Sequence, residues 1–373
     1  MIILALRRGS KIGSWWWSID SMTFLIVLFL MVISLLLVGS AGPAVAVRIG
    51  AAKFHFFQRH LVFICISLIL IVFISCFSRK IVKLLSIFGF FIILSTLILL
   101  PYFGNEIKGA KRWFSIMGFA FQPSEFLKPF YAITIGSILS KDYKERFLFC
   151  ITAHIIVISL LMLQPDFGAT VTISMVVGIQ LFISGIPLLW VFYILFFMGF
   201  VFFVAYNSMP HVASRINNFL YPEQTENYQV TKSLQSFESG GLLGRGPGEG
   251  VVKYSLPDAH TDFIFSVAAE ELGVIFCMLL LLLFLIIFIR GVLVSTKTND
   301  KFIIYSTVGL LSYLVIQSTF NSGVSMNLFP TKGMTLPFIS YGGSSIISFS
   351  IAIGIYLSMT KKSFRHLSER ISG

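Results

Sequence analysis

The chain has 373 residues, of which 56% are hydrophobic and only 12% are charged, and its formal net charge is +12. Soluble domains carry about 25% charged residues and disordered chains are poor in apolar ones, so both classes are excluded. The same values exclude a small disulfide scaffold. The composition indicates a protein that lies in a lipid bilayer.

Ten apolar runs are long enough to cross a bilayer core of about 30 Å, and each predicts a transmembrane helix. The first run follows Arg7, Arg8 and Lys11, a start that also fits a cleavable signal peptide. Its apolar core is longer than the usual 7–15 residues of such a signal, so we expect it to be retained. The predicted spans are 21–39, 61–78, 84–101, 122–140, 147–163, 168–186, 188–206, 263–289, 302–320 and 341–359.

The loops predict the orientation of these spans. An even number of spans places both termini on one side, and the loops of that side carry most of the excess of Lys and Arg. Basic loops mark the cytoplasm, so we expect all-α architecture with both termini cytoplasmic. Residues 1–373 then form one polytopic membrane domain, with cytoplasmic tails at 1–20 and 360–373 and a large periplasmic loop at 207–262 between the seventh and eighth spans. Because the basic residues serve as topology signals, no nucleic-acid partner is expected.

The large outer loop carries unusual sequence. Val230, Leu234 and Phe237 follow a helical spacing and predict a short helix, which ends at a run of glycines. That run, Gly244 to Gly250, lacks the third glycine of a dinucleotide fingerprint and the Lys-Ser/Thr of a phosphate loop, so nucleotide binding is not expected. No histidine has a second ligand at metal spacing, and the four cysteines read as small buried hydrophobic residues, so no metal site is predicted.

Two aspartates precede the eighth span, and two interpretations of them are open. In the first, Asp258 and Asp262 only cap the following helix and complement its dipole. In the second, a carboxylate at the rim of an apolar cavity acts as a general base, with nearby cations to keep it ionised. Asp262, directly before the apolar run, is the better placed base.

A second charged cluster lies between the third and fourth spans. Glu125 and Lys128 are i, i+3 on one helix face, so they can pair, either as a structural ion pair or as part of a site. Lys111 and Arg112, with Lys108, cannot be topology signals on the outer face. They are expected to bind either phosphate groups or anionic lipid headgroups.

Three more outer segments contribute candidates. Asp166 stands in a tight Gln-Pro-Asp-Phe-Gly turn and is either a turn former or part of the site. Arg48 and Arg59, together with Lys53, add cations in the first outer loop. Residues 327–345 contain prolines and glycines that prevent a continuous helix, which predicts a re-entrant stretch lining a cavity.

In this order the motifs resemble the shape, elongation, division and sporulation (SEDS) family of FtsW and RodA proteins, over essentially the full length. The resemblance rests on short stretches that are specific together: Lys108 to Trp113, Gln122 to Lys128, Gln164 to Gly168, Ser239 to Gly246, Leu256 to Phe265, Glu270 to Gly273 and Pro337 to Ser345. Details such as Ala259-His260 are closer to the division-type branch.

The resemblance implies a ten-helix peptidoglycan glycosyltransferase that polymerises lipid II on the outer face of the bacterial inner membrane, at the division septum. It implies Asp262 as the essential carboxylate, and partners that comprise a class B penicillin-binding protein and other membrane proteins of the division machinery. The expected substrate-binding residues, some from the resemblance and some from their charge, are Arg48, Arg59, Lys111, Arg112, Glu125, Lys128, Asp166, His260, Lys332 and Ser344.

The expected chemistry needs one base on the attacking hydroxyl and positive charge on the leaving pyrophosphate, supplied by the cations above or by Mg²⁺ or Mn²⁺. No tightly bound cofactor is expected. Two alternatives remain: a lipid II flippase, which suits charges at membrane depth, and a scaffold without catalysis. Charged motifs at the outer rim favour the enzyme, since transporters usually bind near the midplane.

Overall fold

The computed structural model describes residues 11–107, 110–116, 119–208, 213–214, 217, 228–331 and 333–361. Its main elements are α2 (Lys11–Ser18), α3 (Ser21–Arg48), α4 (His55–Cys76), α5 (Arg79–Phe103), β1 (Asn105–Ile107), β2 (Ala110–Ile116), β3 (Phe119–Phe121), α6 (Pro123–Leu139), α7 (Arg146–Leu163), α8 (Phe167–Ile183), α9 (Leu188–Ser208), α11 (Tyr228–Gly240), η1 (Val252–Tyr254), α12 (Ile264–Ser295), α13 (Lys301–Ser325) and α14 (Gly343–Met359).

A helix occupies each of the ten predicted spans, and the predicted short helix in the outer loop is α11. Within the described residues, α3, α4, α5, α7, α12 and α13 are long and apolar enough to cross a membrane, and α8 and α14 are shorter apolar helices. The helical membrane fold is therefore confirmed. The full count of ten spans and the side that each loop faces stay predictions.

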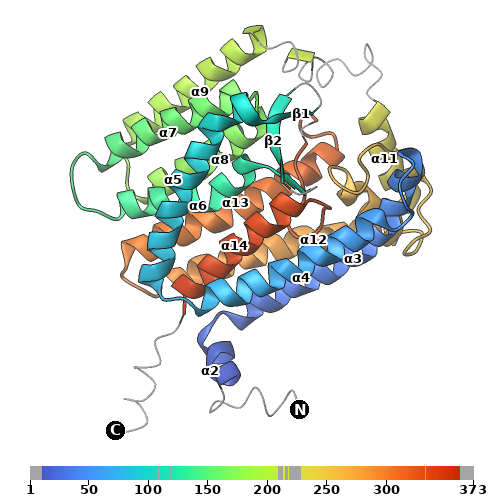
Figure 1. Ribbon diagram of the computed structural model, residues 1–373, viewed down its shortest axis with the longest axis horizontal. Coiled ribbons are helices and arrows are strands. Elements are labelled where there is room, and N and C mark those ends of the chain that lie inside the picture. The colour runs from blue at the N-terminus through green and yellow to red at the C-terminus, as the bar shows by residue number, and fades with distance from the viewer. Residues whose placement is uncertain are drawn as a thin grey trace.

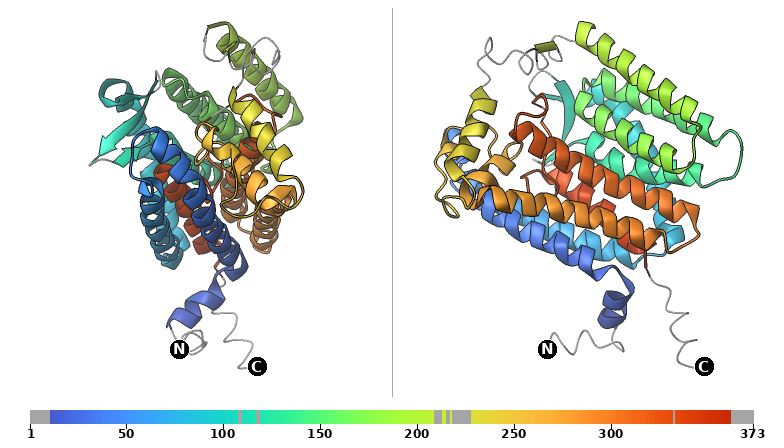
Figure 2. Two further views of the ribbon diagram at one scale, coloured as in Figure 1. Left: turned by 90° about the vertical axis from the view of Figure 1, so that its right-hand side faces the viewer. Right: turned by 180° about the vertical axis from the view of Figure 1, so that it is seen from behind.

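The helices form an elongated bundle with α13 and α14 in its middle (Figures 1 and 2). One hydrophobic cluster joins α3, α4, α12, α13 and α14, and a second joins α5, α6, α7 and α8. In Figure 1, α2 lies at one end of the bundle, and α11 and the strands lie toward the other.

Contacts at the α2 end join segments that were predicted to share the cytoplasmic side. Asp20 Oδ1 pairs with Arg290 Nε at 2.6 Å and Asp20 Oδ2 accepts the Tyr356 hydroxyl at 2.8 Å. Lys301 Nζ reaches Asp142 Oδ1 at 2.6 Å. These contacts hold the start of α3 beside α12 and α14, and the start of α13 beside the segment that follows α6.

Three short strands were not predicted. They form an antiparallel sheet in the order β1, β2, β3, between α5 and α6, and they contain Lys111 and Arg112. In the register, Ile107 faces Ala110 and Ile116 faces Phe119, so two residues separate the members of each pair. Both two-residue connections end in glycine in the sequence, which is a hairpin signal that the sequence offered.

The cysteine prediction was half wrong. Cys150 and Cys277 are buried, as expected, but Cys65 and Cys76 on α4 are exposed. Hydropathy alone cannot say which face of an apolar helix is turned to the bundle, because a helix that faces lipid is apolar on all sides.

Helix α12 is interrupted at one residue. Gly273 has φ 84° and ψ 168°, which no L side chain adopts without strain, and a Cβ there would lie 2.3 Å from the Leu242 carbonyl oxygen. The glycine is therefore required both by its dihedral angles and by the close approach of the loop that follows α11. Before Gly273, α12 bonds the loop that follows α11. After Gly273, α12 packs against the other helices of the bundle.

Candidate active site

The connection between α13 and α14 folds back onto the turn that precedes α12. Asn321 on α13 joins the two segments, because its Nδ2 donates to the Asp262 carbonyl at 2.8 Å and to the Met334 carbonyl at 2.6 Å. Ser340 Oγ donates to the Thr261 carbonyl at 2.6 Å. The expected broken stretch is thus present, and it is bonded to the segment that carries Asp262.

The backbone of the turn itself is tightly specified. Asp258 has φ 51°, and its carbonyl oxygen accepts the N–H groups of Thr261, Asp262 and Phe263 at 3.0, 3.1 and 3.3 Å. Aspartate tolerates this left-handed conformation better than most residues. The turn presents the half-buried Asp262 side chain at the start of α12.

The Asp262 carboxylate lies against Gly333. A Cβ placed on Gly333 would be 3.3 Å from Asp262 Oδ2, closer than most Cβ contacts. A side chain at this position would crowd the carboxylate. Glycine at position 333 therefore allows the connection to pass close to the Asp262 carboxylate.

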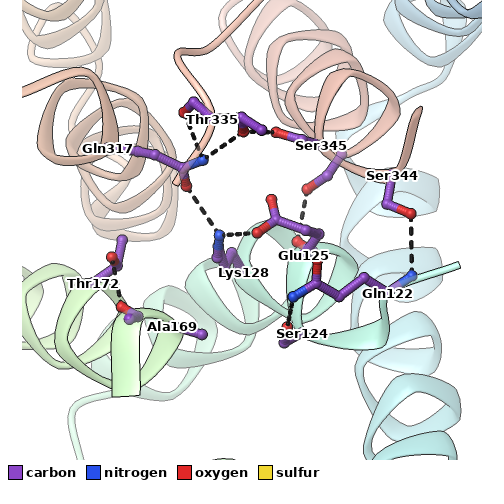
Figure 3. Close-up of polar contacts among 12 residues, drawn as sticks. Gln122, Ser124, Glu125, Lys128, Ala169, Thr172, Gln317, Thr335, Ser344 and Ser345 are labelled. Atoms are coloured by element: carbon purple, nitrogen blue, oxygen red, sulfur yellow. Dashed lines mark hydrogen bonds and ion pairs between the residues drawn. The ribbon is translucent and has the colours of Figure 1, made fainter. Parts of the chain in front are cut away.

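A chain of polar contacts runs from α6 through α13 to the same connection (Figure 3). Lys128 Nζ pairs with Glu125 Oε1 at 2.5 Å and donates to Gln317 Oε1 at 2.9 Å. Gln317 Nε2 in turn donates to the Thr335 carbonyl and hydroxyl oxygens, each at 3.1 Å. The predicted Glu125–Lys128 pair exists, and it is buried rather than exposed.

Two residues of α13 therefore hold consecutive residues of the connection. Gln317 and Asn321 are one turn apart on one face, and they bind Thr335 and Met334 respectively. Asn321 also binds the backbone of Asp262. This arrangement couples the Glu125–Lys128 pair to the position of Asp262 through a single helix face.

Asp166 is a helix cap and a link to α6. Its Oδ1 accepts the Ala169 N–H at 3.1 Å, and its Oδ2 accepts the Ser124 hydroxyl at 2.8 Å. Arg112 on β2 donates from Nε to the Gln164 carbonyl at 3.1 Å and from Nη2 to the Pro165 carbonyl. The described contacts of both residues hold the turn between α7 and α8 in place.

Ser344 links the start of α14 to the segment before α6. Its hydroxyl accepts the Gln122 N–H and donates to the Ala120 carbonyl, both at 3.1 Å. Figure 3 shows Ser344 and Gln122 facing each other across this junction. These bonds use both hydrogen-bonding roles of the hydroxyl within the protein.

The predicted cations occupy different settings. Arg48 is exposed and donates from Nη2 to the Leu256 carbonyl at 2.8 Å, and Arg59 is exposed and bonds the Tyr341 hydroxyl. Lys111 is exposed and reaches the Pro101 carbonyl at 3.3 Å. Lys332 and Lys108 lie outside the described residues. Arg48 and Arg59 are thus tied to the two segments that meet at Asp262.

His260 is buried among aromatic rings. The centroid of its ring is 4.2 Å from that of Phe56 and 5.3 Å from that of Tyr341, and the Tyr341 N–H donates to its carbonyl at 2.9 Å. Burial lowers the pKa of His260 to about 4. The ring is therefore neutral at neutral pH and supplies no positive charge for a phosphate group.

Sequence reasoning missed several residues of this region. Gln317 and Asn321 sit in an apolar run with no motif around them, and nothing in the sequence pairs them with residues 334–335. Lys253, which lies within the predicted outer loop, forms a buried pair with Glu271 at 2.7 Å. Among the residues that the structure describes, no group of three or more His, Cys, Asp or Glu side chains is arranged to hold a metal ion.

Known protein sequences match this chain over most of its length. A family model described as a cell cycle protein, of the FtsW, RodA and SpoVE type, matches residues 20–364. A Caulobacter vibrioides protein named "Probable peptidoglycan glycosyltransferase FtsW" is 36% identical over 362 residues, which cover 95% of this chain and 92% of the relative. A Coxiella burnetii protein of the same name is 36% identical, with coverage of 91% and 96%.

Solved structures share the fold. A chain from a structure described as "Structural coordination of polymerization and crosslinking by a peptidoglycan synthase complex" matches with a TM-score of 0.78 and 25% identity, over 92% of this chain and 98% of that chain. The crystal structure of Thermus thermophilus rod shape determining protein RodA matches with a TM-score of 0.69 and 24% identity, over 92% and 97%.

Proposed function

Because the chain belongs to the FtsW, RodA and SpoVE family of cell cycle proteins, we propose that it is a peptidoglycan glycosyltransferase of the membrane that polymerises lipid II into glycan strands. Asp262 is the general base. The activity is supported by the name that the relatives carry. The substrate and the residue role are supported by the site geometry and by the chemistry below.

The observation that carries this assignment is the placement of Asp262. Its backbone is held by Asn321 at 2.8 Å, its carboxylate lies beside the side-chain-free Gly333, and it is half-buried. A general base needs a fixed position and partial desolvation. The Asn321 bond and the half-burial of Asp262 supply these, at the end of the bundle where Arg48 also binds the neighbouring backbone.

The reaction follows from this layout. The 4-hydroxyl of the acceptor sugar attacks the anomeric carbon of the donor while Asp262 takes the hydroxyl proton. The bond from the anomeric carbon to the pyrophosphate oxygen breaks, and the lipid pyrophosphate leaves with the electron pair. One displacement inverts the donor carbon, so one base suffices and no covalent enzyme intermediate forms.

The leaving pyrophosphate carries the charge that the transition state must stabilise. Arg48 and Arg59 are exposed cations on the segments that meet at Asp262, and Lys111, Arg112 and Lys332 are further candidates from the sequence. Arg112 uses two nitrogens on the backbone of the turn before α8, which leaves its charge in place. A divalent cation, Mg²⁺ or Mn²⁺, would assist at the same oxygens.

The partner proposal is a class B penicillin-binding protein, which would cross-link the strands as they are made. It is supported by the likeness to a chain from a peptidoglycan synthase complex that coordinates polymerization and crosslinking. Both quoted relatives are named FtsW, which supports the division branch, action at the septum of the bacterial inner membrane and association with other division proteins.

Purified protein with lipid II, with and without the partner, tests the assignment by the glycan chains formed. Asp262→Asn should abolish polymer, because the amide cannot accept the proton. Asp258→Asn is the matched control: it removes a carboxylate from the same turn, and asparagine keeps the left-handed backbone, so we expect activity within about threefold of wild type. Polymer at the wild-type rate from folded Asp262→Asn would reject the assignment of the base. Lipid translocation without polymer from the wild type would favour transport.

A further inference from the structure

A lysine outside the proposed active site is buried at the meeting point of three segments. Lys253 Nζ donates to Glu271 Oε1 at 2.7 Å, to Ser40 Oγ at 2.6 Å and to the Gly248 carbonyl at 2.7 Å. The Lys253 and Glu271 side chains are each only 2% exposed. The ammonium therefore has three acceptors, one each from α3, α12 and the glycine loop, and a fixed place among them.

Glu271 and its neighbour Glu270 fasten the same loop through its backbone. Glu271 Oε2 accepts the Gly248 N–H at 2.9 Å, and Glu270 Oε1 accepts the N–H groups of Val251 and Val252 at 2.7 and 2.9 Å. A Cβ on Gly250 would lie 2.9 Å from Glu270 Oε2 and 3.0 Å from Glu271 Oε1. The loop is thus bonded along its length to the outer part of α12.

A continuous series of turns leads from Lys253 to Asp262. The Leu256 N–H donates to the Val252 carbonyl at 3.0 Å, and the Leu256 carbonyl accepts Arg48 Nη2 at 2.8 Å. The next turn is closed by the Asp258 carbonyl, which accepts the Asp262 N–H at 3.1 Å. Pro257 joins these two turns directly, so a short segment made mostly of turns connects Lys253 to Asp262.

Stability alone gives little reason for a charged pair here. Replacing a buried ion pair by apolar side chains of similar size is often neutral or stabilising, because both charges are relieved of their desolvation cost. The pair instead contributes a fixed geometry, because an ammonium with three acceptors holds three segments in place relative to one another. A catalytic group that is misplaced by about 1 Å can lose on the order of 100-fold in rate.

We propose that Lys253 is a positioning residue for the reaction: by bonding Ser40, Gly248 and Glu271, it sets the place of the turn that carries Asp262. The inference rests on the proposed function, because it takes Asp262 as the base. Lys253 does not touch the substrate in this proposal. Its effect therefore falls on the chemical step and not on substrate binding.

The decisive variant is Lys253→Met/Glu271→Met, which removes both charges and keeps side-chain volume. We expect a melting temperature close to that of the wild type, a kcat about 100-fold lower per folded molecule and a KM for lipid II within about twofold. Ser40→Ala, which removes one acceptor, should lower kcat about threefold to tenfold with KM unchanged. Lys301→Met is the matched control, because Lys301 pairs with the exposed Asp142 at the other end of the bundle.

A double variant with wild-type kcat would overturn the inference, and so would a rise in KM at constant kcat. If the double variant does not fold, Ser40→Ala decides, and wild-type kcat in that variant overturns the inference. Asp262→Asn is assayed in parallel. An inactive Asp262→Asn beside a fully active double variant would refute the positioning role alone. An active Asp262→Asn would reject Asp262 as the base, and no polymer from the wild type would refute the proposed function itself.

Discussion

Helices α13 and α7 are both apolar enough to cross a membrane, yet they are used in opposite ways. In α13, 78% of the most apolar 18-residue stretch is buried, against 17% in α7, and α13 has the lower hydropathy. Figure 1 shows α13 within the bundle and α7 toward its edge. The buried polar side chains of α13 are Ser306, Thr307, Ser312, Gln317, Ser318, Asn321, Ser322 and Ser325.

The lipid environment explains why α13 is buried and α7 is not. Lipid tails are as apolar as leucine, so burial of apolar surface gives little driving force between helices in a bilayer. Polar side chains, by contrast, must find partners inside the protein. The least hydropathic of the six long spans therefore lies where the hydrogen bonds are needed, and it holds Thr335 and Met334 beside Asp262.

The largest effect is expected at the buried ion pair that α13 completes. Lys128→Met leaves the Glu125 carboxylate without its cation in a site where the two side chains are 4% and 13% exposed. Breaking a buried pair costs about 3–5 kcal/mol, whereas removing both charges costs far less. Thermal unfolding should show a large loss for Lys128→Met and recovery in Glu125→Gln/Lys128→Met. A double variant as unstable as the single one would contradict this account of the interior.

A pH titration of stability tests whether the His260 ring is buried away from water. Its pKa is lowered from 6.5 to about 4 by burial, so between those values the unfolded chain binds a proton that the folded one does not. Stability should therefore fall as the pH drops from about 6.5 to about 4, by up to about 3 kcal/mol, and then level off. Unfolding at several pH values should show a flatter profile for His260→Gln. Equal slopes in the two proteins would show that the ring is not desolvated.

The hydrogen bonds of Asn321 should matter to the rate more than to the fold. Asn321→Leu removes the bonds to the Asp262 and Met334 carbonyls, worth about 1–3 kcal/mol, which corresponds to a loss of kcat of about fivefold to about 150-fold. Lipid II polymerisation by folded protein measures it. The control is Ser318→Ala on the same helix, since the Ser318 hydroxyl donates to the Val315 carbonyl of α13 in the described contacts and not to the α13–α14 connection. Similar losses in both variants would argue against a specific role.

The smallest effect is expected on α7. The Ile156 side chain is 50% exposed on this helix, so Ile156→Ala should change the free energy of unfolding by less than about 0.5 kcal/mol and leave kcat unchanged. Unfolding in lipid nanodiscs is the appropriate measurement. A loss of more than about 1 kcal/mol would mean that α7 packs against protein and not lipid.

The helices and part of the site were predictable from the sequence, for one reason. A run of about 20 apolar residues forms a helix that crosses the bilayer whatever segments surround it. The pairing of Glu125 with Lys128 was equally local, since an i, i+3 spacing brings them together. The sheet was missed although its two-residue, glycine-containing connections were visible in the sequence.

The remaining site residues depend on contacts between distant segments. Lys253 meets Ser40, which is 213 residues away, and Gln317 meets Thr335 only because the α13–α14 connection folds back. No spacing or propensity encodes either meeting. The polar residues of α13 did offer one signal, because uncharged polar side chains inside a long span need partners within the protein.

The polarity of α13 also affects how the protein is made. A segment with Gln317, Asn321 and many serines gains little free energy on leaving the translocon for lipid, whereas α12 is the most apolar of the six long spans. Only a short turn separates Ser295 at the end of α12 from Lys301 at the start of α13. We therefore expect α13 to enter the bilayer as one hairpin with α12, so that biogenesis of the helix that holds the site depends on the helix synthesised just before it.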